Sequence, residues 1–333
     1  MNSGLIYFYL QTKLPVATKK LFSMKKWILT VSVLVVVIIS ILYFLIPANQ
    51  NAGYQTVVNC TQTASSRKII YTEKWKLWWP GEKINDTLYK YQNYTYSINK
   101  ILLNGIGITI SDNKSSVNGF FQFGYYGHDS TRFDLTYKNN FSSNPLKRFQ
   151  QYFQLKGFKS NVISLLGNIQ KYFDNPENIY GLNIITDKVV ESSFISLKKT
   201  FQQYPSTIEI YQAIESVKGY IKKAAGEEAG FPMLHVENLG PENFELMVAV
   251  PITNELPTEG QYQLKRMHTG YALTAEVTGG VYNVMTGEKE LANYIIDYKI
   301  NSPAIPFQSL VTNRLQETDT TKWITKLNYP VLK

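Results

Sequence analysis

An uncharged apolar run stands out near the start of the chain, WILTVSVLVVVIISILYFLIP at residues 27–47. Its length matches the roughly 20 residues that a helix needs to cross a bilayer. A cleaved signal peptide has a shorter apolar core, of about 7–15 residues, and a small-residue cleavage site, which this sequence lacks after the run. We therefore predict a single uncleaved membrane span over residues 27–47.

Positive charge lies on one side of this run only. Arg67 is the first basic residue after it, whereas five lysines precede it: Lys13, Lys19, Lys20, Lys25 and Lys26. By the positive-inside rule, the N-terminus is then cytoplasmic and the bulk of the chain is extracytoplasmic, as in a single-pass bacterial membrane protein. We expect a cytoplasmic tail at residues 1–23, before a natural-looking start at Met24, and the anchor at residues 24–47.

Beyond the anchor, polar and apolar positions first alternate with a period of two. The two clearest runs, GFFQFGYY and RFDLTYK, each gather three side chains on one face: Phe121, Phe123 and Tyr125, then Phe133, Leu135 and Tyr137. This pattern is typical of half-buried antiparallel strands. Turn sequences such as NGIG and SDNKSSVNG separate these runs, so a meander of several strands is predicted.

The period changes after Asn144, a suitable N-cap that is followed by a proline at the first helical position. Apolar residues then recur at steps of three and four, which predicts one stripe of a long helix that ends near Asp174. The stripe consists of Leu155, Phe158, Val162, Leu165, Ile169 and Phe173.

The rest of the chain contains two similar passes, FPMLHVENLGPENFELMVAVPI at 231–252 and IPFQSLVTNRLQETDTTKWITKLNYPV at 305–331. Each pass reads as a strand, an acidic turn and a second strand. A predicted helix precedes each one, over STIEIYQAIESVKGYIKKAAG and from about Thr286 to Tyr298. We predict an α+β protein with domains at residues 54–180 and 190–333, the second built from two β-α-β-β repeats with a ligand cleft between them.

Composition and charge exclude several kinds of chemistry. The net charge is +9, but beyond Arg67 the basic residues are mixed with acids and form no stripe that would follow nucleic acid. The single Cys60 excludes an internal disulfide, and the three histidines stand far apart in the sequence. Phosphate-binding, dinucleotide-binding and catalytic-serine motifs are absent. We therefore expect no metal, no cofactor and no nucleic-acid partner.

The stretch KWKLWWPGE at residues 74–82 carries a first family resemblance. It follows a strand-like YQTVVNC and a short helical segment, and it precedes the meander and the long helix. Residues 54–180 thereby resemble the SRPBCC superfamily of START and polyketide-cyclase-like proteins. The resemblance implies a helix-grip fold around a cavity for an apolar ligand. For Trp75, Trp78 and Trp79 we favour packing at the end of the sheet over direct ligand contact.

Three stretches of the second domain resemble the GyrI-like family of AraC-type effector-binding domains: GFPMLHV, GYALTAEVTGGVYNVMTGEKELANYI and DTTKWITKLNYPV. The resemblance implies a cleft in which a buried glutamate binds cationic drugs or, in hydrolytic members, acts as an acid. Here the matching position is Gln308, and Leu310 replaces the following aromatic residue. An amide offers a donor and an acceptor but no charge. We therefore expect neither a cation sensor nor a hydrolase of that kind.

The same resemblance places further side chains in the cleft. The expected ligand-binding residues are Gln308, Phe307, Trp323, Tyr271, Tyr282, Tyr211, Phe231 and Met233, and domain core is the alternative interpretation for each. Other polar residues receive structural interpretations: buried histidines (His235, His268), a solvated turn (Glu317, Asp319) and carboxylates in the first turn of the second helix (Glu288, Glu290).

The sequence favours a membrane-anchored protein that binds a neutral or lipid-like hydrophobic or aromatic small molecule without catalysis, although function inferred from fold is analogy. Two alternatives remain open. One is a hydrolase or cyclase of a hydrophobic substrate, which an acidic side chain near Gln308 would favour. The other is an interaction module of an envelope complex, in which side chains fill both cavities.

Overall fold

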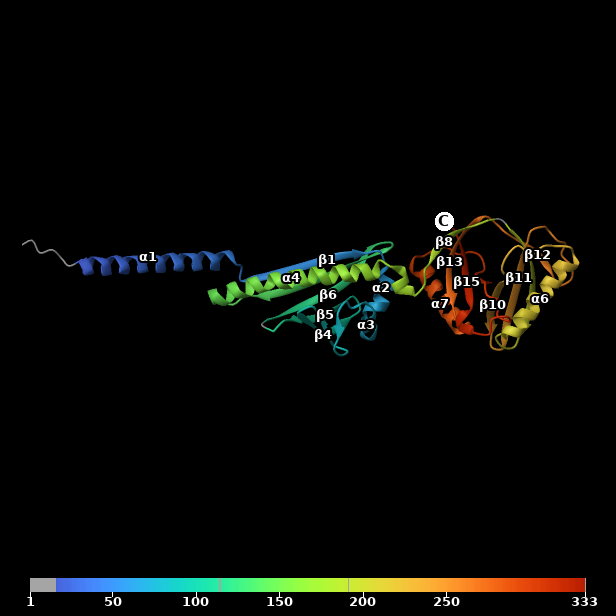
Figure 1. Ribbon diagram of the computed structural model, residues 1–333, viewed down its shortest axis with the longest axis horizontal. Coiled ribbons are helices and arrows are strands. Elements are labelled where there is room, and N and C mark those ends of the chain that lie inside the picture. The colour runs from blue at the N-terminus through green and yellow to red at the C-terminus, as the bar shows by residue number, and fades with distance from the viewer. Residues whose placement is uncertain (1–15, 114, 191, 333) are drawn as a thin grey trace, which may run out of the picture.

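The computed structural model describes residues 16–332, apart from residues 114 and 191. Helix α1, Val16–Leu45, lies at one end, and two antiparallel sheets follow it along the long axis of the molecule (Figure 1). We call residues 49–180 the N-terminal half and residues 185–332 the C-terminal half. The chain is α+β, as the sequence predicts.

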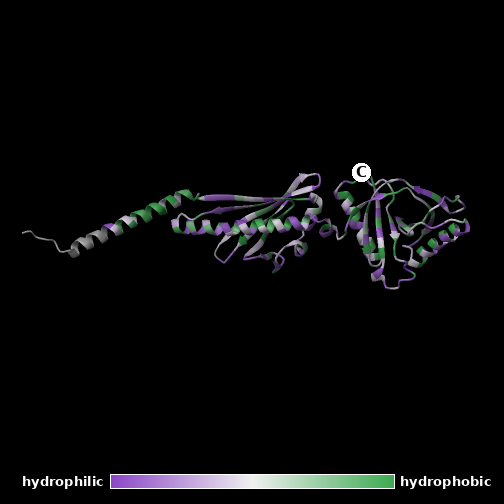
Figure 2. Cartoon of the chain, turned by 45° about the horizontal axis from the view of Figure 1, so that its top comes forward, coloured by the Kyte–Doolittle hydropathy of each residue, from purple (hydrophilic) through white to green (hydrophobic). Residues whose placement is uncertain are grey.

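Helix α1 contains the predicted apolar run. Its segment Lys26–Leu45 is long and apolar enough to cross a membrane, and none of that segment is buried against the rest of the protein. Figure 2 shows hydrophobic residues gathered along the C-terminal part of α1. The helix begins at Val16, inside the segment expected to be a tail. Residues 1–15 of that tail lie outside the described residues.

The N-terminal half is a seven-stranded sheet in the order β1-β7-β6-β5-β4-β3-β2. Its strands are β1 Asn49–Val58, β2 Glu82–Lys83, β3 Leu88–Tyr91, β4 Tyr94–Leu102, β5 Gly105–Ser111, β6 Ser116–Gly127 and β7 Ser130–Asn140. Its helices are α2 Gln62–Ile69, η1 Thr72–Lys74, α3 Trp75–Trp78, α4 Pro145–Phe173 and α5 Pro176–Tyr180. Because α4 follows β7, which pairs with β1, the long helix returns across the sheet (Figure 1).

The predicted alternation and the predicted stripe meet in one core. Every stripe residue of α4 is buried, and the Asn144 side chain caps the helix by accepting from the backbone N–H of Leu146 at 3.0 Å. Five of the six predicted strand residues are buried as well. The exception is Tyr125, which is exposed near the turn between β6 and β7.

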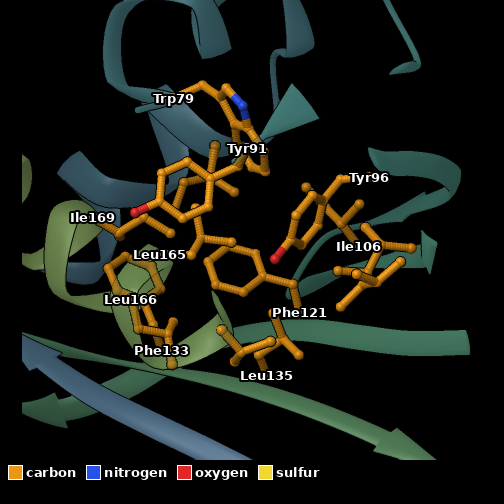
Figure 3. Close-up of a cluster of buried hydrophobic side chains, with 14 of the residues drawn as sticks. Trp79, Tyr91, Tyr96, Ile106, Phe121, Phe133, Leu135, Leu165, Leu166 and Ile169 are labelled. Carbon is orange, nitrogen blue, oxygen red and sulfur yellow. The ribbon is translucent and has the colours of Figure 1, made fainter. Parts of the chain in front are cut away.

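The tryptophan cluster belongs to this core. Trp75, Trp78 and Trp79 are buried, and their indole N–H groups donate to backbone carbonyls of residues 69, 68 and 90 at 2.7, 3.1 and 3.0 Å. Figure 3 shows Trp79 above the side chains that α4 and the sheet contribute. The packing interpretation is therefore confirmed. The same cluster of buried residues includes further aromatic side chains from the sheet and from α4, among them Tyr96, Phe133 and Phe173.

The C-terminal half is an eight-stranded sheet in the order β12-β9-β11-β10-β14-β15-β13-β8. Its strands are β8 Ile185–Val189, β9 Ser192–Phe201, β10 Met233–Gly240, β11 Asn243–Ile252, β12 Gln263–Met267, β13 Gly270–Thr278, β14 Phe307–Leu310 and β15 Ile324–Val331. The helices are α6 Thr207–Lys223, α7 Val281–Asp297 and η2 Thr320–Lys322. Along the chain β9-α6-β10-β11 is followed by β13-α7-β14-β15, and the two series lie on either side of the β10–β14 pair.

Both long helices cover the same face of this sheet. One row of paired residues runs across it on that face: Leu197, Val248, Leu234, Gln308, Leu327 and Ala275. The first three belong to the core under α6, and Leu327 and Ala275 belong to the core under α7. We call this the helix face and the opposite side the open face.

An ion pair between a half-buried arginine and a buried aspartate joins the two halves. Arg67 of α2 donates from both terminal nitrogens to the carboxylate of Asp297 at the end of α7, with Nη1 and Oδ1 2.8 Å apart. The hydroxyl of Tyr180 donates to the same carboxylate at 2.8 Å. The Asp297 side chain has no exposed area, so each of these partners offsets its desolvation.

Asp297→Asn should lower the free energy of unfolding by up to about 3–5 kcal/mol, because it leaves Arg67 without a counter-charge in a largely buried contact. The loss is smaller to the extent that water reaches Arg67. Calorimetry of the full chain should then show the two halves melting separately. Asp134→Asn, which breaks the surface pair with Arg132, is the control and should change stability by at most about 1 kcal/mol. Identical melting curves for both variants would contradict this role of Asp297.

Candidate functional site

The open face of the C-terminal sheet carries a cavity of about 640 Å³. Its wall is mostly apolar: Phe194, Met233, Met247, Met267, Tyr271, Ile305, Phe307 and Pro330. Small-molecule sites are typically apolar concavities of about 300–1,000 Å³, so this cavity has a suitable size and lining. Methionine side chains also adapt to ligands of different shape.

The polar groups of this cavity are basic. Lys265, Arg266, His235 and His268 line it, and no described lining residue is acidic. The Arg266 guanidinium is paired with Glu255, with Nε and Oε1 2.7 Å apart, whereas Nζ of Lys265 lies 3.8 Å from the sulfur of Met247. These charges suit a ligand that is neutral or acidic at its polar end, and they disfavour a cation.

On the helix face, Gln308 is bonded to a carboxylate. Its side-chain amide donates to Oε1 of Glu288 on α7 at 3.0 Å. Glu288 is half-buried, and this burial raises the pKa of its carboxyl, while the bond from Gln308 acts in the opposite direction. The sequence predicts Glu288 in the first turn of the helix, and this prediction is wrong because α7 begins at Val281.

Two signals could have identified this carboxylate. Gly279-Gly280, directly before Val281, is a better helix boundary than the expected start at Thr286. With the helix begun there, Glu288 follows the buried Val284 by four residues, and such positions share one side of a helix.

Arg314 is a second polar residue of the helix face that the sequence analysis missed. It lies in the connection between β14 and β15 and is 6% exposed. Its Nη2 donates to Oγ1 of Thr325 at 2.8 Å, and its guanidinium carbon lies 5.1 Å from the ring centroid of Trp323. Its buried Nε has no hydrogen-bond partner among the described residues.

The structure divides the predicted ligand-binding residues among several places. Met233, Tyr271 and Phe307 line the open-face cavity; Gln308 lines a hollow between α6 and α7; Tyr282 and Trp323 line a third hollow beside Gly279 and Gly280. Tyr211 is buried and bonded to the backbone of residues 312 and 314, and Phe231 lines none of these three sites. Phe307 and Gln308 are adjacent in β14, so their side chains point to opposite faces.

No protein-family model matches the chain, and neither does any curated protein. Among solved structures, the C-terminal domain of EcmrR is similar at 14% identity and a TM-score of 0.40, over 46% of this chain and 98% of that one. SAV2435 bound to tetraphenylphosphonium is similar at 18% identity and a TM-score of 0.32, over 45% and 93%. A hydrolase from Listeria innocua is similar at 12% identity and a TM-score of 0.34, over 44% and 91%.

Glu288→Gln should stabilise the protein near pH 7. Because burial raises the pKa of Glu288, the folded state keeps a proton over a range in which the unfolded chain has lost it. Wild-type stability therefore falls as the pH rises through that range, and the glutamine variant lacks this loss. Thermal melts at about pH 4 and about pH 7 should show that the difference in melting temperature between Glu288→Gln and wild type is larger at the higher pH.

The exposed Glu276 on β13 provides the control, since Glu276→Gln removes a carboxylate of the same sheet that water already solvates. A Glu288→Gln variant that is less stable than wild type near pH 7 would mean that a neighbouring cation stabilises the ionised Glu288.

Proposed function

We propose that the protein is a membrane-anchored small-molecule-binding protein and that the open-face cavity receives its ligand. In this proposal residues 190–333 form a GyrI-like effector-binding domain of two β-α-β-β units, and residues 54–180 form a separate domain. The cavity of about 640 Å³ carries the proposal. Soluble proteins rarely leave a large apolar surface exposed, and a concave apolar surface of this kind commonly marks a ligand site.

The lining defines the class of ligand. Three methionines and several aromatic rings favour a hydrophobic or aromatic body, and the absence of acidic groups among the described lining residues favours a neutral or lipid-like molecule over a cation. Binding of this kind requires no catalytic group, and we propose a non-catalytic role. Tetraphenylphosphonium, the ligand named for SAV2435, is the natural cationic probe for comparison.

The N-terminal half is proposed to act as a docking module and spacer rather than as a second ligand site. Aromatic side chains fill its core, and it is tightly connected to α1. Arg148 of α4 donates from Nη1 to the backbone carbonyls of Tyr43 and Ile46 at 3.1 and 3.3 Å, and its guanidinium carbon lies 4.1 Å from the Tyr43 ring centroid. These bonds satisfy carbonyls that the end of α1 leaves open.

A hydrolase of a hydrophobic small molecule is the second candidate, because Glu288 is a half-buried carboxylate with a raised pKa beside Gln308. Half-buried carboxyl groups of this kind are candidates for general acid–base catalysis. Turnover of a neutral ester that disappears in Glu288→Gln, with folding intact, would favour this candidate over simple binding.

The anchor proposal predicts that the protein keeps its residues before position 48 and faces outward from residue 48 on. Protease added to intact spheroplasts should then degrade both halves while a fragment containing α1 stays with the membrane. A mature N-terminus after residue 48, or protection of the C-terminal half, would contradict the anchor.

Ala249→Phe should fill the cavity and weaken binding of Nile red, a neutral lipid-like fluorophore. Ala249 lines the cavity from β11, so a larger side chain there takes up ligand space. Fluorescence titrations of the detergent-solubilised full chain would compare the variant with wild type. Detergent micelles take up the same amount of dye in both samples, so this background cancels in the comparison. We expect at least about a tenfold loss of affinity, as steric exclusion from a pocket removes more than about 1.4 kcal/mol.

Leu239→Ala is the matched control, because Leu239 is an exposed apolar residue of the neighbouring strand β10, outside the cavity. Unchanged dye binding in Ala249→Phe would overturn the proposal, as would tetraphenylphosphonium displacing Nile red from wild type better than the neutral triphenylphosphine oxide.

A further inference from the structure

Arg314 is a buried cation without a counter-ion among the described residues. Only 6% of the residue is exposed, and none of the ion pairs formed within residues 16–332 includes it. Of its five side-chain N–H donors, one meets Thr325 at 2.8 Å and the one on Nε meets no acceptor. Burial also lowers the pKa of Arg314, because desolvation disfavours the charged form.

Arg314 lines a hollow of about 260 Å³ on the helix face. Ile210 of α6 and Val281 and Val284 of α7 give it apolar walls, while Tyr204, Gln308 and Arg314 give it polar ones. The hollow lies on the opposite side of the sheet from the open-face cavity. It is therefore a separate site, and it does not depend on the ligand proposed for that cavity.

The two carboxylates near the hollow already have partners. Glu209 accepts from the backbone N–H and the hydroxyl of Ser206 at 2.8 and 2.7 Å in the N-terminal cap of α6, and Glu288 accepts from Gln308. The Ser206 hydroxyl also accepts from the backbone N–H of Glu209 at 3.3 Å, which completes the capping box of α6. The charge that remains uncompensated is that of Arg314.

We propose that Arg314 binds a small organic carboxylate in this hollow. An uncompensated buried charge is costly, and the usual solution is a partner of opposite charge with good hydrogen bonds. The planar guanidinium matches a carboxylate with two parallel N–H···O bonds, which a spherical or neutral ligand cannot reproduce. The apolar walls then suit a compact hydrocarbon body, such as a single ring.

Benzoate is the probe, with benzamide as its neutral counterpart and the benzamidinium ion as its cationic one. Isothermal titration of the detergent-solubilised full chain should show benzoate binding at least about tenfold more tightly than benzamide. The reason is that a hydrogen bond from a guanidinium to a carboxylate is stronger than one to a neutral amide. Benzamidinium should not bind measurably. Benzoate should also raise the melting temperature of wild type.

Three variants separate this site from a merely structural arginine. Arg314→Met should abolish benzoate binding without lowering the melting temperature of the ligand-free protein, because it removes an uncompensated charge. Arg314→Lys keeps the charge but loses the planar fork, and it should bind benzoate at least about tenfold more weakly. Glu288→Gln should bind benzoate more tightly, since it removes a nearby negative charge. Arg132→Gln, a surface change in the N-terminal half, is the control.

Equal affinity for benzoate and benzamide would overturn the proposal, and so would unchanged benzoate binding in Arg314→Met. One further result would show that Glu288, and not a ligand, is the partner of Arg314. If wild type binds no benzoate at millimolar concentration, and Arg314→Met and Glu288→Gln are destabilised alike, then Glu288 neutralises Arg314 and no ligand is needed.

Discussion

The eight-stranded sheet of the C-terminal half has two faces, but both of its long helices lie on the same one. Alternate residues of every strand point to opposite sides, so this arrangement determines where each side chain can act. The helix face is packed and contains polar groups that need partners. The open face keeps apolar side chains that neither α6 nor α7 covers. The two sites described above follow from this single asymmetry.

The two buried arginine contacts show how differently one residue type can be used. Arg67 meets a fully buried carboxylate from the other half of the chain, and a tyrosine hydroxyl completes the contact. Arg314 meets a hydroxyl and an indole ring instead, neither of which carries a charge. The free-energy cost of desolvating the guanidinium is offset by an opposite charge at Arg67, and only in part, by uncharged partners, at Arg314. The first contact joins the two halves, whereas the second leaves the Arg314 guanidinium without a counter-charge among the described residues.

Local patterns were sufficient to predict much of the fold. The stripe on α4 and its Asn144 cap are short-range signals, and the structure contains both. The sequence also predicts packing for the tryptophan cluster, and all three side chains are buried, because large aromatic side chains contribute most when they are removed from water. Helix α7 was predicted to begin five residues too late, since the Gly279-Gly280 boundary was not used. That error placed Glu288 at a helix end and concealed its contact with Gln308.

The candidate sites could not be predicted in the same way. Phe307 and Gln308 were assigned to one cleft through family resemblance, although neighbours in a strand point to opposite faces of its sheet. Arg314 gives no signal in the sequence, because its contacts are with Trp323, directly before β15, and with Thr325 in β15. Partners of this kind are set by strand pairing over a distance, and a single sequence does not specify that pairing.

The length of α4 bears on whether a ligand reaches the open-face cavity from the membrane or from water. The helix has 29 residues, which corresponds to roughly 44 Å, and it runs from the end of α1 toward the C-terminal half (Figure 1). In the proposed topology, with α1 in a bilayer, α4 separates the open-face cavity from lipid tails and from molecules that diffuse within the membrane plane. A lipid-like ligand must therefore desorb and cross water, or be handed over by a soluble carrier. Its supply then depends on aqueous solubility and on transfer rather than on membrane composition.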